Sequence, residues 1–239
     1  LRFAPLTRLL IANVRDCVMS KPTGISGFFR VQVGPDGRVS GGFEQTHFSE
    51  DKALVEERIV DRFLASMNKH LASSGDRLIF ADPKRNPEAD FDFTVSGPNG
   101  PAYLELMEIA PLAGPYAEAP RSYKPYEFGK AILSGILEKS ARYPRNMGRA
   151  LFLLTYVTHW TFALSQSTVA CLRYWLRAQP TVFGAIFSYE PLDAEEGVPR
   201  WLFPVPSELL GSFDPEQIRD NVCLNLDPRK GQVVYERNP

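Results

Sequence analysis

Two strand-like segments joined by a turn decide the fold: DFDFTVS (residues 90–96) and AYLELMEI (residues 102–109) flank GPNGP (residues 97–101). Apolar and polar side chains alternate in the first segment and in much of the second, which is typical of β-strands. Gly, Pro and Asn are residues that tight turns favour. The stretch therefore predicts a β-hairpin, in which Gly97 lies opposite Gly100 if residues 98 and 99 form the centre of the turn.

Carboxylates lie on one face of this predicted hairpin. Alternation places Asp90 and Asp92 on one face of the first strand, and it places Glu105 on one face of the second strand with Tyr103 and Met107. In the expected register Asp92 lies across from Glu105, and like charges that face each other destabilise a sheet unless a cation lies between them. Mg²⁺ and Mn²⁺ prefer oxygen ligands of this kind. Asp90, Asp92 and Glu105 are therefore candidate metal ligands, and the alternative is that these acids are solvated on a wet face of the hairpin.

The surrounding patterns place the hairpin in an α/β core. Helices are expected at residues 50–73, 126–143 and 166–178, and further strands at residues 77–81, 150–157 and 182–189. From residue 50 to residue 157 the order is helix, strand, strand, strand, helix, strand. The run at 150–157 is apolar on both faces, as in a central strand covered by helices. The sequence thus predicts an αβββαβ core with a central mixed sheet flanked by helices.

Three regions are expected along the chain. Residues 1–48 are an N-terminal extension that contains a hairpin around GPDG (residues 34–37). Residues 49–190 form the α/β core. Residues 191–239 are rich in Pro and acids and are expected to form a peripheral C-terminal segment with one short helix near 215–220.

Composition narrows the function classes. The 239 residues are 44% hydrophobic and 23% charged with a formal net charge of −1, which indicates a globular protein without a global basic field. Any contact with nucleic acid would therefore need a local basic patch. Cys17, Cys171 and Cys223 have no spacing typical of a disulfide framework or a zinc site. No apolar run approaches the ~20 residues of a membrane helix, so a cytoplasmic protein without a membrane partner is expected.

The element order and the acids resemble the PD-(D/E)xK phosphodiesterase superfamily, which has the restriction-endonuclease-like fold. In that superfamily the second strand supplies an Asp, the third strand supplies an acid-x-Lys triplet, and the first helix often supplies a Glu. By this resemblance the strand Asp is Asp90 or Asp92, the third-strand acid is Glu105, and the helix acid is Glu56 or Glu57. The resemblance covers the middle half of the chain. It implies hydrolysis of phosphodiester bonds in DNA or RNA with Mg²⁺ or Mn²⁺, with DNA favoured over RNA.

The chain departs from this family pattern at the lysine. The residue two positions after Glu105 is Met107, which has neither charge nor N–H group to act on water or phosphate. In some members of the superfamily the lysine has moved to another element, and Lys130, early on the helix after the third strand, is the candidate here. Two functions therefore stay open: a metal-dependent nuclease, or a catalytically inactive nuclease-like fold that binds nucleic acid or protein. A homodimer also stays open.

A basic cluster occurs at the end of the helix expected at 126–143 and in the loop after it. Its members are Lys139, Arg142, Arg145 and Arg149, with Tyr143 among them. The cluster is a candidate for phosphate contacts, and the alternative is that cations gather there because the helix dipole favours them.

Overall fold

A six-stranded mixed β-sheet forms the centre of the computed structural model, which describes residues 26–73, 80–86, 91–97, 99–110, 122–144, 150–192, 197–206 and 210–230. The strands lie in the order β3-β4-β5-β7-β8-β9. Their bounds are Ala81–Arg85 (β3), Phe93–Gly97 (β4), Gly100–Glu108 (β5), Leu151–Tyr156 (β7), Ala185–Pro191 (β8) and Gly197–Phe203 (β9). Strands β5, β7 and β8 are parallel to one another, whereas β3, β4 and β9 are antiparallel to their neighbours.

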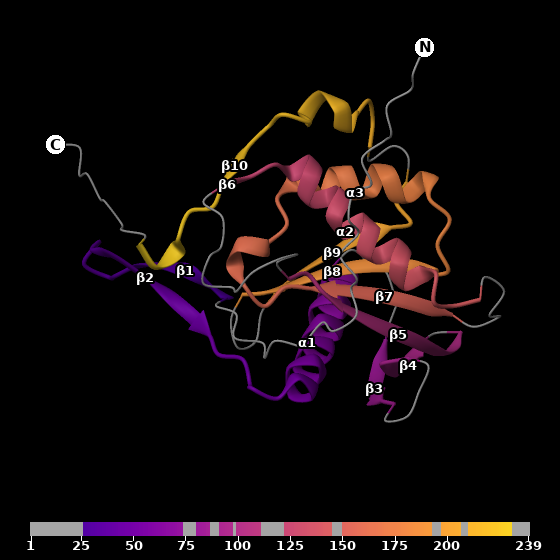
Figure 1. Ribbon diagram of the computed structural model, residues 1–239. Coiled ribbons are helices and arrows are strands. Elements are labelled where there is room, and N and C mark those ends of the chain that lie inside the picture. The colour runs from indigo at the N-terminus through magenta and orange to yellow at the C-terminus, as the bar shows by residue number, and fades with distance from the viewer. Residues whose placement is uncertain are drawn as a thin grey trace, which may run out of the picture.

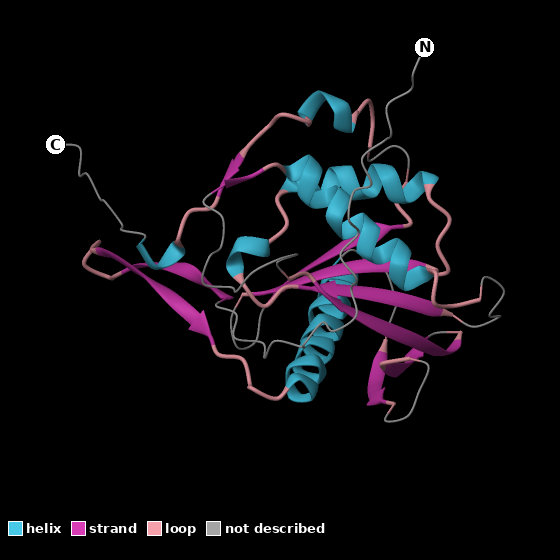
Figure 2. Cartoon of the chain, viewed as in Figure 1, coloured by secondary structure: helices cyan, strands magenta, loops and turns pink. Residues whose placement is uncertain are grey.

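Helices cover both faces of this sheet (Figure 1, Figure 2), with α1 on one face and α2 and α3 on the other. Their bounds are Lys52–Ser73 (α1), Pro125–Ser140 (α2) and Gln166–Ala178 (α3). Because side chains alternate along a strand, Leu104 and Leu106 of β5 pack with α1, whereas Tyr103 and Met107 pack on the side of α2 and α3. The predicted α/β class, with a central mixed sheet between helices, is confirmed.

The β4–β5 hairpin has the register that its turn sequence predicts. Gly97 pairs with Gly100, and the ladder continues to the pair formed by Phe93 and Leu104. Gly100 has a φ of 110°, a backbone conformation that favours glycine. Strand β4 begins at Phe93 rather than at residue 90, so Asp92 directly precedes the strand.

Strand β3 differs from its expected position at 77–81. It spans Ala81–Arg85, and its pairing with β4 is interrupted by an irregularity between Ala81 and Lys84, where Asp82 has a φ of 50°. Asp and Pro are poor strand formers, so this segment lacks the usual strand pattern. Pro83 is tolerated because β3 is an edge strand with β4 as its one neighbour in the sheet. Residues 77–79 lie outside the described part of the chain.

The chain beyond Pro191 contributes more than a peripheral segment. Strand β9 pairs antiparallel with β8, so the sheet extends past the boundary expected at residue 190. Pro199 interrupts the strand pattern in the sequence, and the edge position of β9 accommodates it. The short helix expected near 215–220 is present as η4. The remaining short elements are β6 (Ser122–Tyr123), η2 (Trp160–Phe162), η4 (Pro215–Ile218), β10 (Cys223–Leu224) and η5 (Pro228–Lys230).

The predicted N-terminal hairpin forms a separate two-stranded sheet that projects from the core (Figure 1). It consists of β1 (Ser26–Val33) and β2 (Val39–Thr46). The hydroxyl groups of Ser26 and Thr46 donate hydrogen bonds of 2.9 Å to the carbonyl oxygens of Pro191 and Leu192. These bonds attach the base of the hairpin to the end of β8. No helix among the described residues is long and apolar enough to span a membrane.

Candidate functional site

Two carboxylates and one ammonium group meet where β4, β5 and the end of α2 come together. Lys139 Nζ lies 2.6 Å from Glu105 Oε2 and 3.8 Å from Asp92 Oδ2. Glu105 lies on the face of β5 that is covered by α2, because its neighbours Leu104 and Leu106 face α1. The structure therefore brings together two of the acids expected from the sequence, and it adds a lysine from the helix.

Main-chain groups of β5 complete this arrangement. Lys139 Nζ also donates a hydrogen bond of 2.7 Å to the carbonyl oxygen of Leu106. The Leu106 N–H donates to Asp92 Oδ2 at 2.7 Å, and the Asp92 N–H donates to Glu105 Oε1 at 3.2 Å. The Asp92 carboxylate thus accepts a hydrogen bond from a main-chain N–H group of β5, just beyond the last residue pair between β4 and β5. This bond fixes the carboxylate beside Glu105.

The site is buried at Glu105 and open at Asp92. The side chain of Glu105 is 4% exposed, that of Lys139 is 15% exposed and that of Asp92 is 35% exposed. A buried carboxylate is costly unless it is paired and hydrogen-bonded, and Lys139 meets this need for Glu105. Solvent or a ligand can therefore approach from the side of Asp92.

The contact between α2 and β5 explains why Lys139 reaches the acids. A Cβ atom at Gly135 would lie 3.4 Å from Met107 Sδ, so a side chain larger than that of alanine would not fit between α2 and the methionine. Lys139 follows Gly135 by four residues and therefore lies on the same side of the helix, one turn further along. Met107 shares a sheet face with Glu105, as alternation predicts, and it supports the helix that carries the lysine.

Tyr143, just after α2, is a further partner of Glu105. Burial raises the pKa of Tyr143 above its ordinary value, and the hydrogen bond to Glu105 and the negative charges of Glu105 and Asp92 raise it further. The phenol therefore stays protonated at neutral pH, with its hydroxyl group near the Glu105 carboxylate. Its ring stacks on Phe91 with the centroids 5.6 Å apart, which orients the hydroxyl group.

The helix acids expected from the sequence lie elsewhere. Glu56 Oε2 forms an ion pair of 2.7 Å with Arg85 of β3, and Glu56 Oε1 lies 3.5 Å from Lys52. Glu57 is half-buried on α1. Among the described residues, no group of three or more His, Cys, Asp or Glu side chains is positioned to hold a metal ion, so neither glutamate joins Asp92 and Glu105 in such a group. Asp90 lies outside the described residues, and its role as a ligand stays a prediction.

Lys130, the lysine expected from the sequence, makes its contact with Tyr126 instead of with the two acids. Lys130 is exposed near the start of α2, where its ammonium lies 4.4 Å from the centroid of the Tyr126 ring. Of the basic cluster at the other end of the helix, Lys139 lies in the site and Arg142 is exposed, whereas Arg145 and Arg149 lie outside the described residues. From the sequence, Lys139 is one member of a basic cluster that is a candidate for phosphate contacts, with attraction to the end of the helix dipole as the alternative. The sequence signal for its position is a small residue, Gly135, one helical turn before it.

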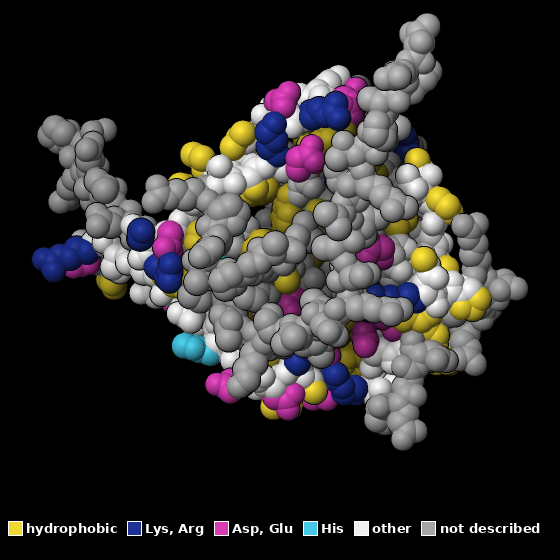
Figure 3. Space-filling model, viewed as in Figure 1, with side chains coloured by type: hydrophobic (Ala, Val, Ile, Leu, Met, Phe, Trp, Pro, Cys, Tyr) yellow, Lys and Arg dark blue, Asp and Glu magenta, His cyan; other side chains and the backbone are white. Residues whose placement is uncertain are grey.

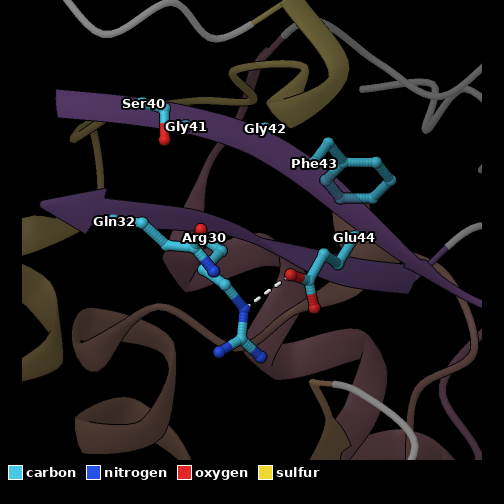
Figure 4. A pocket seen from close by; sticks show the side chains of 7 residues that line it. All are labelled: Arg30, Gln32, Ser40, Gly41, Gly42, Phe43 and Glu44. Atoms are coloured by element: carbon cyan, nitrogen blue, oxygen red, sulfur yellow. Dashed lines mark ion pairs between the residues drawn. The ribbon is translucent and has the colours of Figure 1, made fainter. Parts of the chain in front are cut away.

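Two hollows elsewhere on the molecule lack paired acids. One of about 220 Å³ lies over the β1–β2 hairpin and has a single carboxylate in its lining, that of Glu44, which forms an ion pair with Arg30 (Figure 4). Another of about 260 Å³ is mainly apolar and is lined by residues such as Phe80, Phe152 and Trp201. On the face drawn in Figure 3, acidic and basic side chains are interspersed. The group of Asp92, Glu105 and Lys139, in contrast, combines two carboxylates with an ammonium, and it is the candidate functional site.

Comparisons with known proteins identify no family for this chain. No family model matches the chain, and no curated protein matches it. Among solved structures, the chain is similar to SfsA from Pyrococcus furiosus, determined in complex with Ca²⁺, with 12% sequence identity and a TM-score of 0.28. The match covers 74% of this chain and 91% of that chain. A TM-score this low does not establish a common fold.

Proposed function

We propose that this protein is a divalent-metal-dependent phosphodiesterase of the PD-(D/E)xK type that acts on nucleic acid. Asp92 and Glu105 would hold Mg²⁺ or Mn²⁺, and Lys139 would take the part of the motif lysine that Met107 replaces. The observation that carries this proposal is the position of Lys139 Nζ, 2.6 Å from Glu105 Oε2. The family pattern requires an acid, a second acid and a lysine in one place, and α2 supplies the missing member.

The donor set fits a hard divalent cation. The position of the Lys139 ammonium is surrounded by oxygen atoms from three residues: the carboxylates of Asp92 and Glu105 and the main-chain carbonyl of Leu106. Mg²⁺ prefers oxygen ligands and keeps several waters, so two carboxylates with one carbonyl suit it. The partial exposure of Asp92 leaves space for those waters and for a phosphate oxygen.

Each residue has a distinct part in the proposed reaction. Asp92 and Glu105 would hold the metal, which when bound would supply Lewis-acid polarisation of the phosphate and make water more acidic. Glu105 is held in place by the Asp92 N–H and by Lys139, so its carboxylate is oriented before the substrate arrives. The Lys139 ammonium stabilises negative charge that develops on the phosphate oxygens and helps to orient the attacking water.

The substrate side of the proposal rests on charge and on the family resemblance. Arg142, exposed just after α2, adds a cation on the side of the site where Lys139 and Tyr143 lie. A local cation of this kind is what a chain with a net charge of −1 needs in order to contact a phosphate backbone. We propose DNA in preference to RNA on the basis of the resemblance.

A cleavage assay tests the proposed function. The parent protein, Glu105→Gln, Lys139→Met and Lys124→Met are incubated with labelled single-stranded DNA, double-stranded DNA and RNA, with Mg²⁺, Mn²⁺ or EDTA. Lys124 is the matched control, because it lies at the other end of α2 and pairs with Asp220 at 2.9 Å. We expect metal-dependent cleavage by the parent and by Lys124→Met, and its loss in the other two variants. Cleavage that persists in Glu105→Gln would exclude this site as the catalytic one.

One observation favours the second candidate, a nuclease-like fold that binds without catalysis. Lys139, Glu105 and the Leu106 carbonyl already satisfy one another as an ion pair with a hydrogen bond. Such a pair can hold α2 on β5 without any metal. Nucleic-acid binding by the parent, with no cleavage under any metal, is the result that would favour this candidate.

A further inference from the structure

The Lys139 ammonium lies where a divalent cation would bind. Its nitrogen is 2.6 Å from Glu105 Oε2 and 2.7 Å from the Leu106 carbonyl oxygen, with Asp92 Oδ2 at 3.8 Å. Mg²⁺ binds oxygen at about 2.0–2.1 Å, so an ion bound to the first two of these oxygens would overlap the ammonium. Metal and ammonium therefore exclude each other, both by contact and by repulsion of like charges.

We infer that Lys139 is a built-in competitor for the metal: its ammonium holds the cation position in the resting protein, and the divalent cation displaces it into the space beside Asp92. This inference rests on the proposed function, because it assumes that metal binds at Asp92 and Glu105. Three features of the site make the exchange feasible. The lysine is attached through four flexible carbons, the neighbouring Asp92 is 35% exposed, and the helix that carries Lys139 need not move.

The exchange changes the charge that a phosphate meets. In the resting site, two carboxylates and one ammonium leave one net negative charge among these three groups, which repels a phosphodiester. With a divalent cation bound and Lys139 displaced but still nearby, the same groups carry one net positive charge. The site then attracts the phosphate, and the released ammonium is available to contact it. Metal should therefore bind before nucleic acid.

Metal affinity is the first test, because it does not depend on cleavage. Calorimetric titration with Mn²⁺ compares the parent, Lys139→Met, Glu105→Gln and Lys124→Met. Removal of a tethered competitor should make Lys139→Met bind Mn²⁺ about tenfold more tightly than the parent, because a tethered group acts at a high effective concentration. Lys124→Met should match the parent, and Glu105→Gln should bind more weakly. Equal or weaker binding by Lys139→Met overturns the inference.

Lysine labelling of the parent protein is the second test, and it requires no variant. Lys139 is 15% exposed and ion-paired, so reductive methylation should modify it slowly in the absence of metal. Mg²⁺ should raise its modification several-fold as the ammonium is released, whereas the exposed Lys130 should react equally with and without metal. Unchanged or slower labelling of Lys139 in Mg²⁺ overturns the inference, and this test decides if Lys139→Met does not fold.

The two proposals fail in different ways. Metal-dependent cleavage by the parent, together with unchanged metal affinity in Lys139→Met, removes the exchange and leaves the proposed function in place. If neither the parent nor Lys139→Met binds Mn²⁺, both proposals are overturned. Mn²⁺ binding by Lys139→Met that is undetectable in the parent supports the exchange and indicates a protein kept inactive by its own lysine.

Discussion

Lys139 of α2 and Leu106 of β5 are joined by a 2.7 Å hydrogen bond from the ammonium to the main-chain carbonyl oxygen, although 33 positions separate them in the chain. This bond places the lysine beside Glu105 by attaching it to the backbone next to the acid. Strand β5 has Met107 where the family pattern has a lysine. Lys139 binds to the same strand from the neighbouring helix α2. Its position depends on how α2 packs on the sheet.

Substitutions at Gly135 should separate stability from activity. Gly135→Ala places its Cβ at ordinary contact distance from Met107 Sδ, and alanine favours a helix over glycine by about 1 kcal/mol. We expect an equal or higher free energy of unfolding and unchanged cleavage. Gly135→Leu should push α2 away from Met107, separate Lys139 from Glu105 and abolish cleavage. Urea unfolding and the DNA cleavage assay check both, and full activity in Gly135→Leu would contradict this account of the helix contact.

A lysine moved to the strand should partly replace the lysine on the helix. Lys139→Met leaves the buried Glu105 carboxylate without its cation, and we expect a loss of about 3 kcal/mol in the free energy of unfolding. In the double variant Met107→Lys with Lys139→Met, the new ammonium lies on the same sheet face as Glu105. Stability and metal-dependent cleavage should both recover in part, as measured by urea unfolding and plasmid nicking. The proposed equivalence of the two positions fails if the double variant is less stable than Lys139→Met.

The Tyr143 hydroxyl group should be needed to orient Glu105. Tyr143→Phe keeps the stacking on Phe91 but removes a polar hydroxyl group near a buried carboxylate, which should lower the free energy of unfolding by about 1–2 kcal/mol. Cleavage should fall more than substrate binding does, because the effect acts through Glu105. Steady-state kinetics and urea unfolding provide the measurements, with Tyr174→Phe on α3 as the control. Equal losses in the two variants would show that the hydroxyl has no special part.

Glu56 should matter for stability rather than for metal binding. Its carboxylate pairs with Arg85, whose side chain is 33% exposed, so Glu56→Gln should cost about 1–2 kcal/mol of unfolding free energy, less than for a fully buried pair. Affinity for Mn²⁺ should stay at the parent value, since Glu56 makes its ion pairs with Lys52 and Arg85 instead of lying at Asp92 and Glu105. Calorimetry and urea unfolding test this. A loss of Mn²⁺ affinity would restore Glu56 as the helix ligand expected from the sequence.

Local sequence patterns were sufficient for the β-hairpin and for the proximity of Asp92 and Glu105. The turn sequence defined the pairing of Gly97 with Gly100, and alternation then placed Glu105 on the sheet face of Met107. Alternation left open whether that face is covered, and the structure shows that α2 covers it. The lysine required longer-range information. Proximity along the chain favoured Lys130, but the crossing of α2 over β5 brings Lys139 to the acids, and that crossing requires a small residue at position 135 against Met107. Strand β9 was missed because Pro199 interrupts its pattern, which an edge strand tolerates.

The division of the site between two structural layers has a consequence for engineering. The carboxylates belong to the sheet, whereas the ammonium belongs to a helix that rests on buried side chains, Ile132 and Ile136. Any redesign of those isoleucines, even one chosen only for thermostability, also changes the distance between the Glu105 carboxylate and the Lys139 ammonium. A larger residue at either position would move α2 away from the sheet. The ion pair between Lys139 and Glu105 would then be weakened, although every charged residue is unchanged.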